Sequence, residues 1–309
     1  MSRGLNRRHV VAGAGALALA ACDRSAKSAP ALPSAPVTSL KADAPFPLGV
    51  CAQVAHLNDP TWVTLATQHF SQITAEWEMK MEYIVLPDGS LRFDRPDQFA
   101  AFCAANGMRL FGHTLIWYSQ TPESFEKLTD QAAFEKAYDD YIHTVVGRYK
   151  GRAVAWDVVN EAVAEQGDGY RECLWSTRLG QIDYMRRAFD KAHEADPDAL
   201  LLINEYNLEH IPKKLDSYQR LIETLLKAGA PLSAIGCQTH TAASVDSGKI
   251  TAAIKAIGRF GLPIHMSELD VSLIQGRPQL FTSREELLRN HARVYAEAVE
   301  AFGSLPAKQ

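Results

Sequence analysis

An α/β barrel of the TIM type is the fold class that this sequence predicts, and three observations predict it. Short apolar runs alternate with stretches of helical periodicity from Phe46 onward. The runs are continuous rather than alternating, which is typical of parallel strands that are buried on both faces. Polar residues able to take part in chemistry follow nearly every run, and a barrel gathers such strand ends around one mouth.

Seven apolar runs are the candidate strands of this barrel. They are 46–54, 71–77, 109–117, 153–161, 199–206, 233–240 and 263–271. The segments between them have the periodicity of helices. Within 214–231 the apolar residues form one stripe, which Gly229 and Pro231 end. The segment 283–303 opens with a capping box between Ser283 and Glu286, so we predict a helix there.

An open, doubly wound sheet is the alternative, because serial βα units with right-handed crossovers build both folds. Such a sheet concentrates its site at one crevice, where the strand order reverses. No glycine-rich phosphate fingerprint follows the first run, which also disfavours a dinucleotide-binding fold. Residues suited to chemistry instead end six of the runs, and this favours the barrel: Glu76, His113, Trp117, Asn160, Glu161, Asn204, Glu205, Gln238, His240, Glu268 and Asp270.

The composition is that of an ordinary globular protein and excludes several classes of function. Hydrophobic residues make up 47% of the chain and charged residues 22%. A net charge of −4 gives no basic surface, so we expect no nucleic-acid partner. Neither a metal-ligand spacing nor a phosphate-binding loop is present, so we expect no metal and no cofactor. We expect a monomer.

Residues 1–22 predict an export signal. The sequence MSRGLNRRHVVAGAGALALAAC has a basic start, an apolar run and small residues before Cys22. The pair Arg7–Arg8 resembles a twin-arginine signal, and LAAC (19–22) resembles a lipoprotein processing site at which Cys22 would be lipidated. A plain secretory peptide with a chance cysteine is the alternative. Both predict an exported protein that is periplasmic, in the cell envelope or secreted, and lipidation would anchor it to a membrane.

Residues 23–44 are predicted to be a flexible linker, since Ser, Ala and Pro dominate and no apolar period appears. The barrel domain is therefore expected to span 45–309. Four cysteines lie within that domain, and their spacing fits no metal site. Free buried thiols are favoured over disulfides for Cys51, Cys103, Cys173 and Cys237.

Glu161 and Glu268 end the fourth and the seventh candidate strands, which lie on roughly opposite sides of a barrel mouth. Two carboxylates that flank one bond are what glycoside hydrolysis requires. One carboxyl group must keep its proton near neutral pH while the other stays ionised. Either glutamate alone could equally form an ion pair or cap a helix, so the prediction depends on the pair.

Six motifs follow one another along the chain: TAEWEMK (74–80), HTLIW (113–117), WDVVNEA (156–162), NEYN (204–207), GCQTH (236–240) and SELDV (267–271). Together they resemble glycoside hydrolase family 10, the endo-β-1,4-xylanases, over residues 46–303. The resemblance implies a (β/α)8 barrel that hydrolyses xylan or xylo-oligosaccharides by a retaining double displacement. Carboxyl groups about 5–5.5 Å apart are expected for that mechanism.

The resemblance also implies roles for single residues. Glu161 matches the acid/base and Glu268 the nucleophile. Asn160 matches the amide that bonds the sugar 2-hydroxyl, and His240 the histidine that bonds the nucleophile. Asp270 would orient that imidazole, whose charge would lower the pKa of Glu268. The implied substrate-binding residues are Glu76, Lys80, His113, Trp117, Gln120, Tyr206, Asn207 and Gln238.

Four departures from the family pattern modify these expectations. Trp77, Tyr118 and Ser124 stand where the family has asparagine, histidine and tryptophan, which predicts an altered glycone subsite. The family's eighth strand would follow the helix that ends at Phe302, but only GSLPAKQ (303–309) comes after it. We therefore expect an incomplete barrel of seven strands, without the eighth strand and helix. A truncated gene, which we favour, closure by the N-terminal region and completion by another chain are the open explanations.

Two alternatives to a xylanase stay open at this stage. The same barrel and glutamates could act on another sugar polymer, such as a β-glucan. A non-catalytic or weakly active carbohydrate-binding surface lipoprotein, on a truncated barrel, is the alternative from another class.

Overall fold

The computed structural model describes residues 38–309. The predicted signal peptide with Cys22 and most of the predicted linker lie outside the described residues. The end of that linker is described, and its helix α1 (Leu40–Asp43) packs against α2 (Pro60–His69). Lys41 Nζ donates a hydrogen bond to the carbonyl oxygen of Thr67 at 2.6 Å. Residues 38–44 are thus part of the folded domain.

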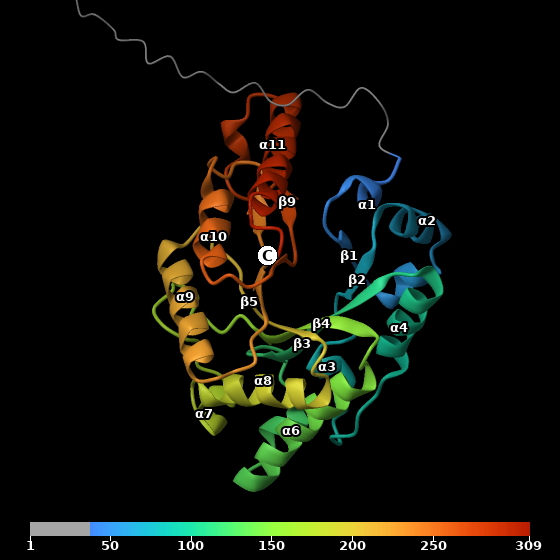
Figure 1. Cartoon of the computed structure of the whole chain (residues 1–309), viewed down its shortest axis with the longest axis vertical. Helices are drawn as coiled ribbons and strands as arrows, with labels where there is room; N and C mark the ends of the chain where they lie inside the picture. Colours follow the sequence, from blue (N-terminus) through green and yellow to red (C-terminus); the bar gives the residue numbers. More distant parts are fainter. Residues whose placement is uncertain (1–37) are drawn as a thin grey trace, which may run out of the picture. The chain divides into compact units, whose positions relative to one another are not determined.

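Seven parallel strands form the main sheet (Figure 1). Each pairs with its neighbours in the order β1–β2–β3–β4–β5–β6–β8. Helices connect the consecutive strands, which confirms the predicted βα repeat. The strands are β1 (Gly49–Ala52), β2 (Gln72–Ala75), β3 (Arg109–Trp117), β4 (Ala153–Asn160), β5 (Leu200–Asn204), β6 (Ala234–Cys237) and β8 (Ile264–Met266).

All seven predicted strands are present, but the last two apolar runs are each interrupted. The run 233–240 holds β6 and the first residue of β7 (His240–Ala242), and the run 263–271 holds β8 and the start of β9 (Asp270–Ser272). β7 and β9 pair with each other in parallel, as a separate small sheet. Glu268 therefore lies in the short segment between β8 and β9, just past the end of the seventh strand of the main sheet.

Helices pack on the main sheet, with α4 against β2 and β3 and α8 against β4 and β5. The predicted helices near 214–231 and 283–303 are both present. Ser283 Oγ accepts from the backbone N–H of Glu286 at 3.1 Å, but the Glu286 carboxylate bonds Thr282, so only half of the predicted capping box forms. No helix within 38–309 is long and apolar enough to cross a membrane.

The remaining helices have the following bounds: α3 (Met81–Ile84), α4 (Asp94–Asn106), α5 (Glu123–Glu126), α6 (Gln131–Arg148), α7 (Leu174–Leu179), α8 (Asp183–Ala195), α9 (Pro212–Lys227), α10 (Lys249–Gly258) and α11 (Arg284–Gly303). Two short 3-10 helices, η1 (Val54–Asn58) and η2 (Pro278–Leu280), complete the secondary structure of the described part.

The sheet curves far enough for side chains of β2 and β8 to meet. Gln72 Nε2 lies 3.4 Å from His265 Nε2, and the His265 ring centroid lies 4.2 Å from that of Phe111 on β3. Small and apolar side chains of β4, β5 and β6 pack with Phe111 in this inner layer. The larger core holds most of the other buried apolar side chains, among them those of the helix faces that pack on the strands.

The barrel is open between β1 and β8, since no ladder joins these two strands within residues 38–309. This confirms the predicted incomplete barrel of seven strands. Cys51 on β1 is exposed because its strand is at the edge of the sheet, so the prediction that all four thiols are buried is wrong there. The rings of Phe46 and Phe302, from opposite ends of the domain's sequence, meet edge to face at 4.9 Å.

Gly112 on β3 is a position where the packing tolerates no side chain. A Cβ at this residue would lie 2.1 Å from the indole ring of Trp156, which is fully buried on β4. We therefore expect Gly112→Ala to lower the free energy of unfolding by about 1–3 kcal/mol, the usual cost of overpacking. Urea unfolding would measure it. Gly147→Ala is the matched control, because a Cβ there meets nothing within 4 Å, and an equal loss in both variants would contradict the packing argument.

Candidate active site

A cleft with a cavity volume of about 290 Å³ lies at the carboxyl ends of the strands. Its lining comes from β3, β4 and β7 and from the segments that follow β2, β4, β5, β6 and β8. Every lining residue is one of the predicted site residues, so the structure brings these residues together in one cleft. The lining residues are Lys80, His113, Trp117, Asn160, Glu161, Tyr206, Gln238, His240 and Glu268.

Backbone strain gathers at the same strand ends. Four residues other than glycine have a left-handed φ within the described part of the chain: Gln120 (52°), Glu161 (58°), Asn207 (58°) and Thr239 (60°). They follow β3, β4, β5 and β6 in turn. Such a conformation costs of order 1–3 kcal/mol per residue and persists only where the surroundings hold it. Of the four, Glu161 lines the cleft, and such clustering is typical of functional sites.

The carboxylate of Glu161 is held by two hydrogen bonds, one from Trp117 at the end of β3 and one from Gln238 just after β6. Gln238 Nε2 donates to Glu161 Oε1 at 3.0 Å, and Trp117 Nε1 donates to Glu161 Oε2 at 2.8 Å. Gln238 Nε2 also lies 3.3 Å from Asn160 Oδ1. Each carboxylate oxygen of Glu161 thus accepts one hydrogen bond that fixes its orientation. The residue also lines the cleft.

Asn204 at the end of β5 joins the two halves of the site, although the sequence analysis gives it no role beyond a polar strand end. Its Nδ2 donates to Asn160 Oδ1 at 3.0 Å and to Glu268 Oε1 at 3.1 Å. Its Oδ1 accepts from Ser267 Oγ at 2.8 Å. A Cβ at Gly236 would lie 2.4 Å from that same oxygen, so only glycine leaves room for this amide. The NEYN motif was the signal that could have predicted it.

Glu268 is ionised in this environment. Burial acts to raise its pKa, but hydrogen bonds from His240 and Asn204 and the charges of His113 and His240 bring the pKa down to about 2. His240 Nε2 lies 3.3 Å from Glu268 Oε2, and His240 Nδ1 lies 3.0 Å from Asp270 Oδ2. The hydrogen bond with Glu268, opposed by burial and supported by both carboxylate charges, raises the pKa of His240 to about 9.

Two buried pairs of an acidic and a basic side chain lie at the cleft. His113 Nδ1 lies 2.9 Å from Asp157 Oδ2, and Lys214 Nζ lies 3.0 Å from Glu205 Oε1, with both side chains of the second pair fully buried. Burial raises the pKa of Glu205 to about 7, although the charge of Lys214 acts in the opposite direction. Within residues 38–309, no cluster of three or more His, Cys, Asp or Glu side chains could hold a metal ion.

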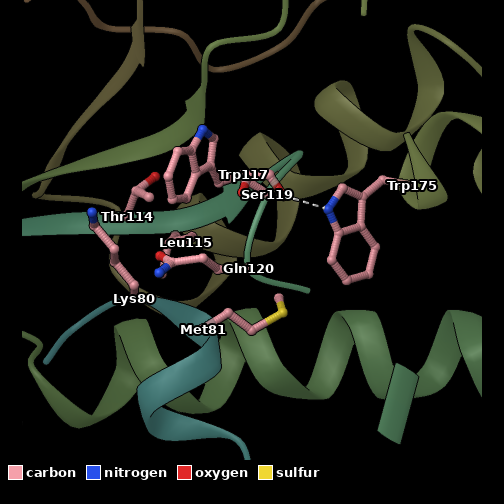
Figure 2. Close-up of a pocket in the computed structure, with 8 residues that line it drawn as sticks. All are labelled: Lys80, Met81, Thr114, Leu115, Trp117, Ser119, Gln120 and Trp175. Carbon is pink, nitrogen blue, oxygen red and sulfur yellow. Dashed lines mark hydrogen bonds between the residues drawn. The ribbon is translucent and has the colours of Figure 1, made fainter. Parts of the chain in front are cut away.

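Gln120 faces a second cavity next to the cleft, of only about 10 Å³, which has room for about one water molecule (Figure 2). Its Oε1 is buried there without a hydrogen-bond partner. Trp117 lines both cavities, and Lys80 Nζ lies 4.9 Å from the centroid of its ring. Trp175 Nε1 donates to the carbonyl oxygen of Trp117 at 2.8 Å and fixes the end of β3.

Three further predicted residues do not line the cleft. Glu76 accepts a hydrogen bond from Gln53 Nε2 at 3.2 Å, and Asp270 acts on the cleft only through His240. The carbonyl oxygen of Asn207 accepts from the backbone N–H groups of residues 210 and 211, in the turn that leads into α9. Substrate contacts by Glu76, Gln120 and Asn207 stay predictions.

Two of the residues that depart from the family pattern have aromatic partners. The Trp77 side chain is 41% exposed and stacks on Tyr83 of α3, with ring centroids 6.2 Å apart. The guanidinium of Arg171 lies 3.9 Å from the ring centroid of Tyr118. Ser124 lies in α5, where its Oγ is buried without a hydrogen-bond partner. The altered glycone subsite stays a prediction.

Comparison with known proteins gives a family match over nearly the whole described part. The model for “Glycosyl hydrolase family 10” matches residues 38–308. Endo-1,4-beta-xylanase A of Thermotoga maritima is 41% identical over 239 residues, which cover 74% of this chain and 22% of that protein. Endo-1,4-beta-xylanase A of Caldicellulosiruptor sp. is 40% identical over 242 residues, 74% of this chain and 35% of that protein. The chain thus spans well under half of these two relatives.

Solved structures are similar as well. A GH10 structure from Paenibacillus barcinonensis has a TM-score of 0.79 at 32% identity and covers 86% of this chain and 81% of that one. A mutant of TsXylA, an intracellular xylanase from Thermoanaerobacterium saccharolyticum, in complex with xylotetraose, has a TM-score of 0.76 at 30% identity. That match covers 85% of this chain and 83% of the TsXylA chain.

The ion pair between His240 and Glu268 makes stability depend on pH in a defined window. The pKa of His240 rises from 6.5 to about 9, so its contribution is complete below 6.5 and is lost as pH rises through 9. The pKa of Glu268 falls from 4.5 to about 2, so its contribution is complete above 4.5 and is lost as pH falls through 2. The stabilisation by the pair is therefore greatest between pH 4.5 and 6.5.

We expect His240→Gln to remove this dependence. The difference in free energy of unfolding between the wild type and this variant should shrink as the pH rises from about 5.5 to about 9.5. Urea unfolding at several pH values would measure it, with His193→Gln on the outer helix α8 as control. A difference that stays constant across this range would contradict the assigned ion pair.

Proposed function

This chain belongs to glycosyl hydrolase family 10, and we propose that it is an endo-β-1,4-xylanase that cleaves xylan or xylo-oligosaccharides with retention of configuration. The family match and the curated relatives named as endo-1,4-beta-xylanases support the reaction and the substrate class. The similarity to the xylotetraose complex of TsXylA supports a chain of β-1,4-linked xylose as the ligand. No metal or other cofactor takes part in the proposed reaction.

One observation carries the proposal: Glu161 and Glu268 line the same cleft but have different partners. Glu268 has a pKa of about 2 beside the protonated His240, so it is an anion that can attack a sugar carbon. Among residues 38–309, no cationic side chain is bonded to the Glu161 carboxylate, which has only the neutral donors Trp117 and Gln238. The two environments fit the division of labour that double displacement requires.

In the first step, Glu268 would form a bond to the anomeric carbon while the bond to the leaving oxygen breaks. Glu161 would give its proton to that oxygen, so the leaving sugar departs neutral. In the second step, Glu161 would take a proton from water, and the water oxygen would displace Glu268. Asn160, bonded to Asn204 and Gln238, would direct its amide N–H groups to the sugar 2-hydroxyl.

Export and lipidation belong to the same proposal. Residues 1–22 have the pattern of an export signal, which supports an exported protein. Cys22 would carry the lipid, which would anchor the catalytic domain to a membrane through the Ser/Ala/Pro-rich linker. Labelling of the whole cells' lipoproteins, with Cys22→Ser as control, would test it.

A carbohydrate-binding lipoprotein with little or no turnover is the second candidate, and the open edge of the barrel favours it. Calorimetry with xylohexaose beside a reducing-sugar assay separates the two. Binding with product release supports the xylanase, whereas binding without product supports the second candidate.

We expect Glu268→Ala to abolish turnover of aryl β-xylobiosides, because no group remains to form the glycosyl–enzyme bond. Azide should restore turnover by attacking the anomeric carbon from the vacated side, which gives the inverted glycosyl azide. Proton NMR of the product would identify the anomer. A folded variant that binds substrate but yields no azide product would remove Glu268 from the nucleophile role.

We expect Glu161→Ala to spare the first step on substrates with good leaving groups and to slow it by about 10²–10⁴-fold on poor ones, the usual contribution of a general acid. Stopped-flow measurement of the burst would separate the two steps. Azide should here give the retained anomer, opposite to the product of Glu268→Ala. Equal losses on good and poor leaving groups would count against Glu161 as the acid.

A further inference from the structure

Arg171 lies in the loop between β4 and α7 and contacts several parts of the cleft wall at once. Its Nε donates to the carbonyl oxygen of Glu161 at 3.1 Å, and its Nη2 donates to the hydroxyl of Tyr206 at 3.1 Å. Its Nη2 also lies 3.4 Å from the carboxylate of Glu165, which accepts a hydrogen bond from Tyr206. Its plane lies over the ring of Tyr118, 3.9 Å from the centroid.

The first of these bonds falls on the strained residue of the site. Glu161 has a φ of +58°, a conformation that an L-residue keeps only when neighbours hold it. The peptide that leaves Glu161 carries the carbonyl bonded by Arg171, and the backbone N–H of Arg171 donates to the carbonyl oxygen of Ala162 at 2.7 Å. The loop thus folds back on its own start and fixes the backbone on which the Glu161 side chain is carried.

The other contacts of Arg171 are with two tyrosines, Tyr206 and Tyr118. Tyr206 lines the cleft, and Lys214 Nζ lies 3.3 Å from its ring centroid on the side of the buried pair with Glu205. Tyr118 follows the cleft residue Trp117 and stands where the family has histidine. The contact between Tyr118 and Arg171 therefore involves a residue that differs from the family pattern. Arginine suits this place because its planar fork donates in several directions and stacks on aromatic rings.

From this geometry we infer that Arg171 is a positioning residue for the proton donor Glu161, and that it sets the orientation of the Tyr206 and Tyr118 rings beside the cleft. This inference rests on the proposed function. Arg171 touches neither the sugar carbon nor the transferred proton, so it acts through Glu161 and the two rings. Its loss would displace the acid relative to the leaving oxygen and leave Glu268, which is held by Asn204 and His240, in place.

The test is the dependence of kcat/KM on the leaving group, measured with a series of aryl β-xylobiosides of graded phenol acidity. Arg171→Gln should lower kcat/KM by about 10- to 100-fold for the poorest leaving groups, the loss expected from misplacing a catalytic group by about 1 Å. Dinitrophenyl xylobioside needs no proton, so its kcat/KM should change little. Arg171→Lys keeps the positive charge but lacks the planar guanidinium. Its kcat/KM for poor leaving groups should therefore lie between those of the wild type and Arg171→Gln.

Arg178→Gln is the matched control. Arg178 also fixes a loop, donating to the carbonyl oxygen of Leu128 at 2.5 Å, and its guanidinium also lies over an aromatic ring, that of Phe134, at 4.2 Å. It contacts no residue of the cleft lining. We expect this variant to lose thermal stability as Arg171→Gln does but to keep the wild-type leaving-group dependence.

Each outcome decides the inference. A steeper dependence on the leaving group in Arg171→Gln alone supports it. Equal losses across the series, or a slope that is unchanged from the wild type in a folded variant, would overturn it and leave Arg171 a structural residue. If the wild type itself turns over none of the aryl xylobiosides, the proposed function fails instead, so the two failures are distinct.

Discussion

The geometry of the cleft depends on the pair of hydrogen bonds that Asn204 donates, one to Asn160 and one to Glu268. Asn204 is fully buried, so each polar atom of its amide must find a partner inside the protein. Its oxygen is bonded by Ser267, and Gly236 leaves the space that the amide needs. One side chain thereby fixes the ends of β4 and β5 and the segment after β8 relative to one another, which brings the two glutamates to one cavity.

Of the two glutamates that line the cleft, only Glu268 is paired with a cation within residues 38–309. The buried carboxyl groups of Asp157 and Glu205 have His113 and Lys214 as partners, since an unpaired buried charge would be costly. Glu268 has the protonated His240 as its partner and is therefore kept as an anion.

Glu161, on the other side of the cleft, has only neutral hydrogen-bond donors on its carboxylate. The nearby cation Arg171 donates to the backbone carbonyl oxygen of Glu161 and not to its carboxylate. The same loop can therefore hold Glu161 in place without adding a direct ion pair to the carboxylate, which would favour its ionised form and oppose proton donation.

Period and order along the chain predict the strands and the strand-end residues of the cleft, whereas Lys80 and Tyr206 are predicted only by the resemblance to the family. Continuous apolar runs require burial on both faces, and residues at the ends of such strands share one mouth. Side-chain direction does not follow from the same pattern. Gln120, which only the resemblance to the family predicts, lies three residues beyond β3 with a left-handed backbone and lines the smaller cavity. Arg171 stands ten residues beyond Glu161 in an irregular loop, and no period predicts their contact.

The open edge of the sheet lies beside the strand that precedes Glu268, yet the contacts that hold Glu268 all come from the closed side. Its backbone N–H donates to the carbonyl oxygen of Gln238 at 3.1 Å, and its carboxylate is bonded by Asn204 and approached by His240. Asn204 ends β5, and Gln238 and His240 follow β6, strands with a neighbour on each side. No residue of β1 lines the cleft. Because an unpaired edge removes only the hydrogen bonds along that edge, the opening weakens the barrel as a whole before it moves the two carboxylates apart.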